Sequence, residues 1–225
     1  MKRGVIRSLK LACLLCVLAF AVSGCNLNIP SLQFPGSSQG GGYNNAPQQQ
    51  ARHYDFPSGR PATFQAFKDR YQSVGTSPEG AVRMYFDAVY SYIDPARKTE
   101  GAKMLRYSLH EGKNWEKSPA LATFVSRLKN PSYHYIFRSF AEGTSAENSY
   151  EMNPDNYRLM FDSTRQETDY VYVSIWSNGA DNPRPLHVQQ FEDGLWYVIN
   201  NHGTYTDVYK PANQTRRGGH DADKD

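Results

Sequence analysis

The sequence predicts an α+β domain in which N-terminal helices pack on a curved antiparallel sheet. Apolar residues recur at helical spacing through the first part of the domain, up to about residue 130. From residue 133 onward the apolar period shifts towards two, which indicates strands. An Asp193-Gly194 pair between the last two of these stretches is typical of a tight hairpin, so antiparallel pairing is expected.

Two helices are expected at the start of the domain. A short one contains Phe64, Phe67 and Tyr71, which follow i, i+3, i+7 spacing. A longer one begins at Ser77-Pro78-Glu79, where a capping hydroxyl, a proline and an acid all suit a first helical turn. Asp94-Pro95 ends this helix, and one of its faces is apolar: Val82, Tyr85, Phe86, Val89 and Ile93.

Two further helical stretches follow. One covers residues 97–109, with Ala102, Leu105 and Leu109 on its inner face and Gly112 after its end. The other begins at Ser118-Pro119 and stops at Asn130-Pro131. Its apolar stripe consists of Leu121, Phe124, Val125 and Leu128.

Five strands are expected, at residues 133–140, 157–163, 170–177, 186–191 and 195–200. In the third of them, both alternating sets of side chains are apolar or aromatic. This pattern indicates a sheet that is covered on both faces.

Polar segments are expected on both sides of the domain, which is predicted to span residues 62–210. Residues 25–61 are rich in Gly, Ser, Asn, Gln and Pro without a hydrophobic period, as in a flexible linker, and residues 211–225 form a polar tail expected to be disordered. Residues 1–24 have the proportions of a secretory signal peptide, because a basic start precedes a short apolar run. That run has about a dozen residues, whereas a membrane-spanning helix needs about 20.

The end of this segment, Val22-Ser23-Gly24-Cys25, resembles the lipobox of bacterial lipoproteins. The resemblance implies that the Cys25 thiol carries a diacylglyceryl group and that acyl chains such as palmitate anchor the protein. Two or more such chains hold a protein stably on a bilayer. The expected location is the cell membrane or the outer membrane, with the domain outside the cytoplasm, and Asn26 in place of Asp favours the outer membrane. The alternative is an ordinary secretory signal in which Cys25 has no role.

The order of a long helix followed by a curved meander resembles the nuclear transport factor 2-like cone, also called cystatin-like. Another α+β sheet with the same order of elements is the alternative. Three strings also resemble a family of uncharacterised bacterial lipoproteins: SPEGAVRMYFDAVYSYI (77–93), YHYIFRSFAEGTSAENSYEMNPDNYRL (133–159) and FEDGLWYVINNHGTY (191–205). This second resemblance implies no known activity and no catalytic residue.

Charge and cysteine content exclude several classes of function. Four of the 25 basic residues lie in the first 24 residues, which hold no acid, so 21 basic residues face 22 acidic ones after a cut before Cys25. No basic stripe remains to neutralise phosphates, and a nucleic-acid partner is not expected. The other cysteines are Cys13 and Cys16, so the domain has no disulfide, thiolate metal site or cysteine nucleophile.

Catalytic and metal-binding candidates are few. Some members of the cone fold are isomerases or dehydratases, and Asp162, His187 and His202 are the best candidates for a general base, with Tyr172 or Tyr197 as donors. Each of them is more simply explained as a surface or packing residue. The six histidines lack H-x-x-x-H and H-E-x-x-H spacing, and the acidic stretch 147–155 lacks the order of a calcium loop, so no metal or other cofactor is expected.

The aromatic residues of the strands suggest a surface for recognition. We expect Tyr172, Trp176, Trp196 and Tyr197 to line a pocket or partner surface, although aromatic residues on a sheet also form cores. The leading hypothesis is a non-enzymatic, membrane-anchored envelope lipoprotein that binds a small ligand or another envelope protein. The alternatives are an isomerase or hydrolase using a cone-fold pocket, and a structural or assembly subunit of an envelope complex.

Overall fold

A computed structural model describes residues 51–215. The predicted signal peptide, the lipidation site Cys25, the first part of the linker and most of the polar tail lie outside the described residues. Along the described chain, the helices are α1 (Phe64–Val74), α2 (Pro78–Ile93), α3 (Lys98–Ser108), α4 (Ala122–Lys129), α5 (His134–Arg138) and α6 (Ala212–Thr215). The strands are β1 (Phe161–Gln166), β2 (Val171–Ile175), β3 (Arg184–Gln190) and β4 (Trp196–Asn200).

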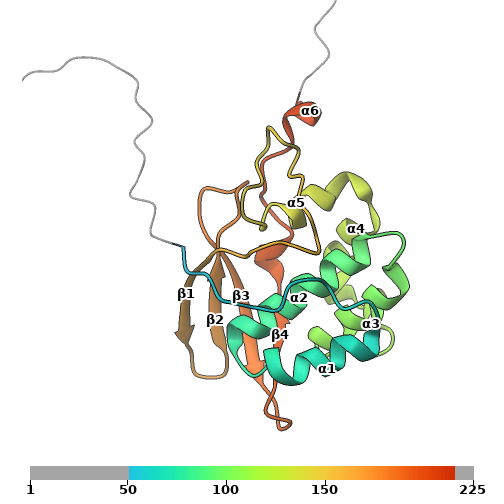
Figure 1. Cartoon of the computed structure of the whole chain (residues 1–225), viewed down its shortest axis with the longest axis vertical. Coiled ribbons are helices and arrows are strands. Elements are labelled where there is room, and N and C mark those ends of the chain that lie inside the picture. Colours follow the sequence, from blue (N-terminus) through green and yellow to red (C-terminus); the bar gives the residue numbers. More distant parts are fainter. Residues whose placement is uncertain (1–50, 216–225) are drawn as a thin grey trace, which may run out of the picture. The chain divides into compact units, whose positions relative to one another are not determined.

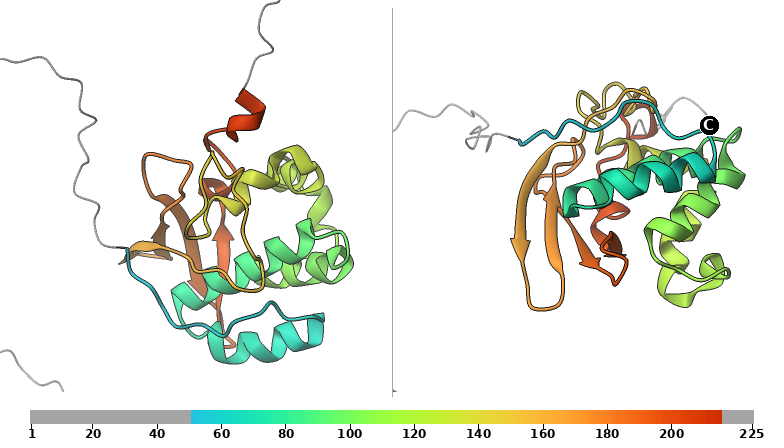
Figure 2. Two further views of the ribbon diagram at one scale, coloured as in Figure 1. Left: turned by 45° about the horizontal axis from the view of Figure 1, so that its top comes forward. Right: turned by 60° about the horizontal axis from the view of Figure 1, so that its bottom comes forward.

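The described residues form helices packed against a four-stranded antiparallel sheet, which confirms the predicted α+β class (Figure 1). The strands are hydrogen-bonded in the order β1-β2-β3-β4, so each strand pairs with its neighbour in the chain. The sheet lies on one side of α2, and α3 and α4 lie on the other (Figures 1 and 2). Short 3₁₀ turns connect the later elements: η1 (Trp115–Lys117), η2 (Pro119–Leu121), η3 (Pro131–Tyr133) and η4 (His202–Thr204).

Helix α2 forms the centre of the core. Its first turn has the predicted cap, because the Ser77 side chain accepts a hydrogen bond from the Gly80 amide and Pro78 is the first helical residue. Every residue from Gly80 to Tyr92 is buried, so α2 is buried nearly all round rather than along a single stripe. It contacts α1, α3, α4, α5 and three strands.

The hairpin between β3 and β4 also matches its prediction. The Phe191 amide donates to the Leu195 carbonyl at 3.0 Å, and the Gly194 amide donates back to the Phe191 carbonyl at 2.9 Å. Gly194 has a φ of +80°, a left-handed conformation that glycine adopts without steric cost.

One predicted strand is wrong. Residues 133–140 form the end of η3, helix α5 and a turn. The Asn130 side chain accepts from the Ser132 amide and Pro131 occupies the first turn, so the chain is capped for helical geometry. Three consecutive side chains, Tyr135, Ile136 and Phe137, are buried there, whereas a strand would bury alternate ones.

The first observed strand starts later than predicted, at Phe161 rather than residue 157. The two faces of the sheet also differ. Val171, Val173, Leu186 and Val188 are buried in the core, whereas Tyr172 and His187 on the other face are only half-buried. On that outer face, His187 packs against Tyr170 and Tyr172, and Arg165 lies over the Tyr172 ring. These side chains thus cover one another.

Residues 52–60, which precede α1, pack along the domain, although the linker was predicted to extend to residue 61. Arg52 and Phe161 form a β-bridge, with amide–carbonyl distances of 2.7 and 3.0 Å. The Tyr54 ring packs edge-on against Phe161 at 5.0 Å. In Figure 1 this segment, in cyan, runs from the β1 side of the sheet to the start of α1.

Candidate functional site

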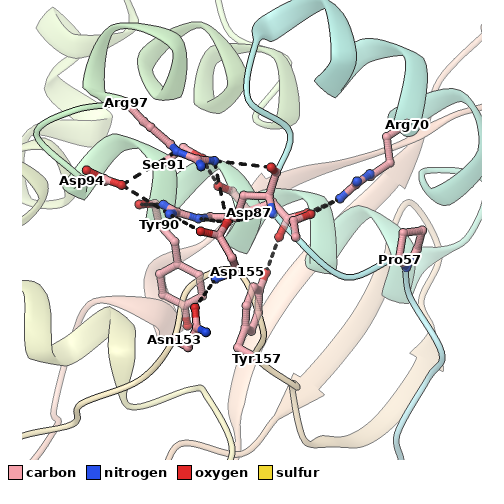
Figure 3. A network of polar contacts seen from close by, with 12 residues as sticks. Pro57, Arg70, Asp87, Tyr90, Ser91, Asp94, Arg97, Asn153, Asp155 and Tyr157 are labelled. Carbon is pink, nitrogen blue, oxygen red and sulfur yellow. Dashed lines mark hydrogen bonds and ion pairs between the residues drawn. The ribbon is translucent and has the colours of Figure 1, made fainter.

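A charged network lies inside the core, and buried ionisable groups of this kind often mark active sites. Asp87, in the middle of α2, has no exposed surface. Its Oδ1 accepts from Arg83 Nε at 3.2 Å and from the Tyr157 hydroxyl at 2.8 Å. Its Oδ2 lies 3.8 Å from Arg70 Nη1 on α1. Figure 3 shows Arg70 and Tyr157 approaching Asp87 from separate segments of the chain.

Burial sets the titration behaviour of this network. It raises the pKa of Asp87, and the charge of Arg83 and the hydrogen bond from Tyr157 limit the rise. Burial also raises the pKa of the Tyr157 phenol well above its ordinary value, and the nearby Asp87 charge raises it further. The phenol therefore stays protonated as a donor to the carboxylate.

The network is closed to substrate. Arg83 and Tyr157 are only 5% and 6% exposed, and the Arg83 guanidinium lies 4.0 Å from the centre of the Tyr157 ring. Arg83 Nη1 also donates to the Tyr157 carbonyl at 3.2 Å. The Tyr157 ring and the Arg83 guanidinium cover the Asp87 carboxylate. We therefore assign this network a structural role, in which it joins α1, α2 and the chain before β1.

A second ionic cluster holds the segment before α1. Arg60 Nε donates to Asp155 Oδ1 at 3.0 Å, Nη1 to the Tyr90 carbonyl at 2.7 Å, and Nη2 to Asp94 Oδ2 at 3.3 Å. Arg97 Nη1 lies 3.7 Å from Asp155 Oδ1. Since Arg60 directs its guanidinium donors at protein acceptors, this cluster too is structural.

An open groove is the more suitable place for a ligand. It lies where the C-terminal end of α3 and the loop after it meet the β3–β4 hairpin, and its volume is about 490 Å³. We call it the tyrosine groove. Its lining residues are Arg106, Tyr107, His110, Glu111, Gly112, Lys113, Asp193 and Tyr197.

Two tyrosine hydroxyls lie within hydrogen-bonding distance of each other in the tyrosine groove. The Tyr197 hydroxyl donates to Asp193 Oδ2 at 2.7 Å and lies 3.3 Å from the Tyr107 hydroxyl. The Tyr197 ring stacks on Tyr71 of α1, with centroids 5.3 Å apart. Burial, followed by the Tyr107 and Asp193 contacts, raises the pKa of Tyr197, so its phenol remains protonated.

His110 completes one wall of the groove. It follows α3 in a left-handed conformation, with a φ of 51°, which is uncommon outside glycine. Its ring stacks on Phe191 at 4.0 Å and meets Tyr197 at 4.9 Å. The hairpin and the end of α3 are thus joined by ring contacts.

A second hollow of about 320 Å³ adjoins the tyrosine groove and shares Arg106 and Lys113 with it. We call it the lysine hollow. Its other lining residues are Ala102, Lys103, Asn114, Trp115, Glu116 and Lys117. Lys103 pairs with Glu100 and Glu116 pairs with Lys129. Within the described part of the chain, the side chains of Arg106, Lys113 and Lys117 form no ion pair.

The three predicted catalytic candidates lie in different places. Asp162 is on β1, where its Oδ2 accepts from the Ser163 hydroxyl. His187 is on the outer face of β3 and stacks on Tyr170 at 4.2 Å, and burial lowers its pKa. His202 is exposed in η4, after β4. In the described residues no hydrogen bond or ion pair joins any two of these three.

The four predicted surface residues are divided between sites. Tyr197 lines the tyrosine groove. Trp196 is partly buried against the core, and its amide donates to the Gly75 carbonyl at 2.8 Å. Tyr172 lies on the outer face of β2, under Arg165, and Trp176 is half-buried just after that strand.

The sequence reasoning missed Tyr107, His110, Arg106 and Lys113 as site residues. The only local signal was the Asp193-Gly194 hairpin, which places Asp193 beside Tyr197. Among residues 51–215 no group of three or more His, Cys, Asp or Glu side chains is placed to hold a metal ion. No helix in this range is long and apolar enough to cross a membrane.

Comparison with known proteins identifies a family without assigning an activity. No curated protein and no solved structure matches the chain. The model of one family, described as a domain of unknown function (DUF6935), matches residues 60–212. The match covers more than half of the chain, from Arg60 of the ionic cluster to the start of α6. The chain therefore belongs to the DUF6935 family.

Proposed function

We propose that this protein is a lipid-anchored envelope protein whose domain binds a ligand, without transforming it, in the tyrosine groove. The observation that carries the proposal is the composition of the groove, in which a row of tyrosine hydroxyls lies beside the unpaired cations Arg106 and Lys113. Open hollows with aromatic walls and a few polar groups are typical ligand sites.

The anchor rests on the sequence. A basic start, a short apolar run and Val22-Ser23-Gly24-Cys25 together resemble a lipoprotein signal. Lipidation at Cys25 would hold the domain at a membrane surface outside the cytoplasm, and Asn26 favours the outer membrane.

The groove favours binding over catalysis, because Asp193 and Tyr197 are already engaged in hydrogen bonds and His110 is stacked against the hairpin. Asp193 accepts from the Leu195 amide at 3.0 Å and from the Tyr197 hydroxyl at 2.7 Å, so both of its oxygens serve the hairpin. Tyr197 stays protonated, and the His110 ring is stacked on Phe191. A general base needs a free lone pair within reach of the substrate proton.

We also propose that the domain is a four-stranded variant of the nuclear transport factor 2-like cone. Support comes from the long helix α2, which packs on the β2, β3 and β4 strands of an antiparallel meander. An experimental structure that superposes on cone-fold proteins over α2 and all four strands would support this assignment. A different helix-to-sheet arrangement would contradict it.

The ligand proposal is tested by photocrosslinking in intact cells. A photoreactive amino acid replaces Glu111 in the groove in one variant and Gln166 at the far edge of the sheet in a matched control. Irradiation is expected to add a discrete mass to the Glu111 variant only. Equal adducts at both positions, or none at position 111, would contradict the proposal.

A further inference from the structure

We infer that the tyrosine groove and the lysine hollow form one trough that binds an anionic oligosaccharide, such as a short chain of uronic acids. The inference rests on the proposed function, in which this groove is the binding site, and adds the chemical class of its ligand. It is carried by shape, by charge and by the groups that line the trough.

The shape suits an extended ligand. The two hollows, of about 490 and 320 Å³, share Arg106 and Lys113, so they adjoin each other at the end of α3 and the loop that follows it. Each is open to solvent. An enclosed cavity would suit a compact small molecule, whereas an open trough admits a chain that continues past both ends.

The charge of the trough suits an anion. Arg106 and Lys113 lie at the junction of the hollows and Lys117 lies in the lysine hollow, and none of them has a carboxylate partner among residues 51–215. Of the three acids in the lining, Glu116 is paired with Lys129. Asp193 accepts hydrogen bonds from neutral groups only, so Asp193 and Glu111 are the two acids without an ion-pair partner among residues 51–215, against three such cations. Hydrogen bonds from guanidinium or ammonium groups to carboxylates are among the strongest available to such a site.

The other groups suit sugar hydroxyls. Tyr107 is partly buried, and its hydroxyl can both donate and accept hydrogen bonds. The Tyr197 hydroxyl lies 3.3 Å from it, but Tyr197 is only 2% exposed and donates to Asp193, so it supports Tyr107 and is not itself a donor to the ligand. Aromatic rings with a polar tip are suited to amphipathic ligands. A sugar ring offers hydroxyls at its rim and C–H groups on its faces, so it complements such a lining.

An acidic peptide fits the trough less well. Peptides gain affinity by adding a strand to a free sheet edge or by placing a helix in an apolar groove. The free edge of β4 is already engaged at Trp196, where the amide donates to the Gly75 carbonyl and the carbonyl accepts from the Tyr71 hydroxyl at 2.7 Å. The trough has polar groups where a helix would need apolar ones.

The test measures binding of defined probes to the full chain by isothermal titration calorimetry. The probes are a hexamer of galacturonic acid, the same hexamer with its carboxyls reduced to alcohols, and hexaglutamate. We expect the acidic sugar to bind at least about tenfold more tightly than the other two, because charged hydrogen bonds depend on its carboxylates. The double variant Arg106→Ala/Lys113→Ala should lose about tenfold or more in affinity.

A matched control removes two cations elsewhere. Arg165 on β1 and Lys210 lie outside both hollows, so Arg165→Ala/Lys210→Ala changes the net charge equally and should bind as the unchanged protein does. Equal loss in both double variants would overturn the inference, because it would indicate attraction by net charge alone.

The remaining outcomes separate this inference from the proposed function. Equal binding of the neutral hexamer would overturn the role of the cations, and equal binding of hexaglutamate would overturn the sugar class. Absence of binding by the acidic sugar would overturn the inference outright. In each case the photocrosslink at position 111 still decides independently whether the groove holds a ligand.

Discussion

At the scale of single residues, the largest energetic effect is expected at Asp87. The Asp87 carboxylate is fully buried in a region of low dielectric constant, where it accepts hydrogen bonds from Arg83 and Tyr157. Isolated buried charges are costly, so these groups depend on one another. The network therefore fixes how α2 meets the chain before β1 rather than adding net stability.

We expect Asp87→Ala to lower the free energy of unfolding by about 3–5 kcal/mol, because it leaves the Arg83 guanidinium buried and unpaired. Urea denaturation followed by circular dichroism measures this change. Asp169→Ala, at an exposed turn, is the control and should change stability by less than about 0.5 kcal/mol. Similar losses in both variants would show that the buried network has no special role.

Asp155 gives a pH-dependent prediction. The hydrogen bond from the Arg60 side chain lowers the pKa of Asp155 below its ordinary value of 3.8. Around these pKa values the native state binds fewer protons than the unfolded state. The ionised Asp155 therefore contributes to the free energy of unfolding above pH 3.8, and this contribution is lost as the pH falls through the native pKa. Because the carboxylate is 43% exposed, solvent screening keeps this contribution small.

The variant Asp155→Asn measures this effect. The difference in unfolding free energy between the unchanged protein and the variant should be largest near neutral pH and should shrink as the pH falls below 3.8. Urea denaturation across pH 3–7 gives the difference. A difference that grows towards acid pH would show that the sign of the pKa shift is wrong.

At the scale of secondary-structure elements, close packing sets the angle between α2 and α3. Gly101 of α3 faces the α2 backbone, and a Cβ atom there would lie 2.3 Å from the Tyr92 nitrogen and 2.5 Å from the Ser91 carbonyl carbon. Backbone atoms cannot move aside as a flexible side chain can. The absence of a side chain is therefore what permits this contact.

We predict that Gly101→Ala destabilises the domain by about 1–3 kcal/mol through overpacking. Helix propensity alone predicts the reverse, a gain of up to about 1 kcal/mol. Thermal unfolding distinguishes the two results. Gly112→Ala, where a Cβ atom meets nothing within 4 Å, is the control and should have little effect.

Elements were predictable where several local signals agreed. Helix α2 has a cap, a first-turn proline and a continuous apolar face, and it was found with its bounds. Helix α5 has only five residues. Its apolar run is too short to show a helical period, and the sequence pattern therefore predicted a strand there. The strand predicted at residues 157–163 included Tyr157, which instead lies before β1 and donates its hydroxyl to Asp87 in the core.

The site was less predictable than the fold, because its parts come from distant segments. Tyr107 and Tyr197 are 90 positions apart and meet through the packing of α3 beside β4. Their neighbours Arg106 and Lys113 appear in the sequence as ordinary surface cations. Sequence patterns report the period of each element, and only tertiary packing shows which ends of the elements converge.

At the scale of the whole molecule, the start of the described chain and the tyrosine groove lie at opposite edges of the sheet. The described chain begins beside β1, where Arg52 bridges Phe161. β1 and β4 are the two edge strands (Figure 1), and Tyr197 of β4 lines the groove. Under the proposed anchoring at Cys25, the chain would enter the domain at the edge away from the proposed binding site.

Lipidation of Cys25 is the central claim at this scale, and labelling with a fatty-acid probe followed by membrane fractionation tests it most directly. The unchanged protein and a Cys13→Ala/Cys16→Ala control are expected to take up the label and to sediment with membranes. Cys25→Ala is expected to lose the label and to appear in the soluble fraction, because the proposed acyl chains are attached through this thiol. A Cys25→Ala protein that remains labelled and membrane-bound would contradict the account.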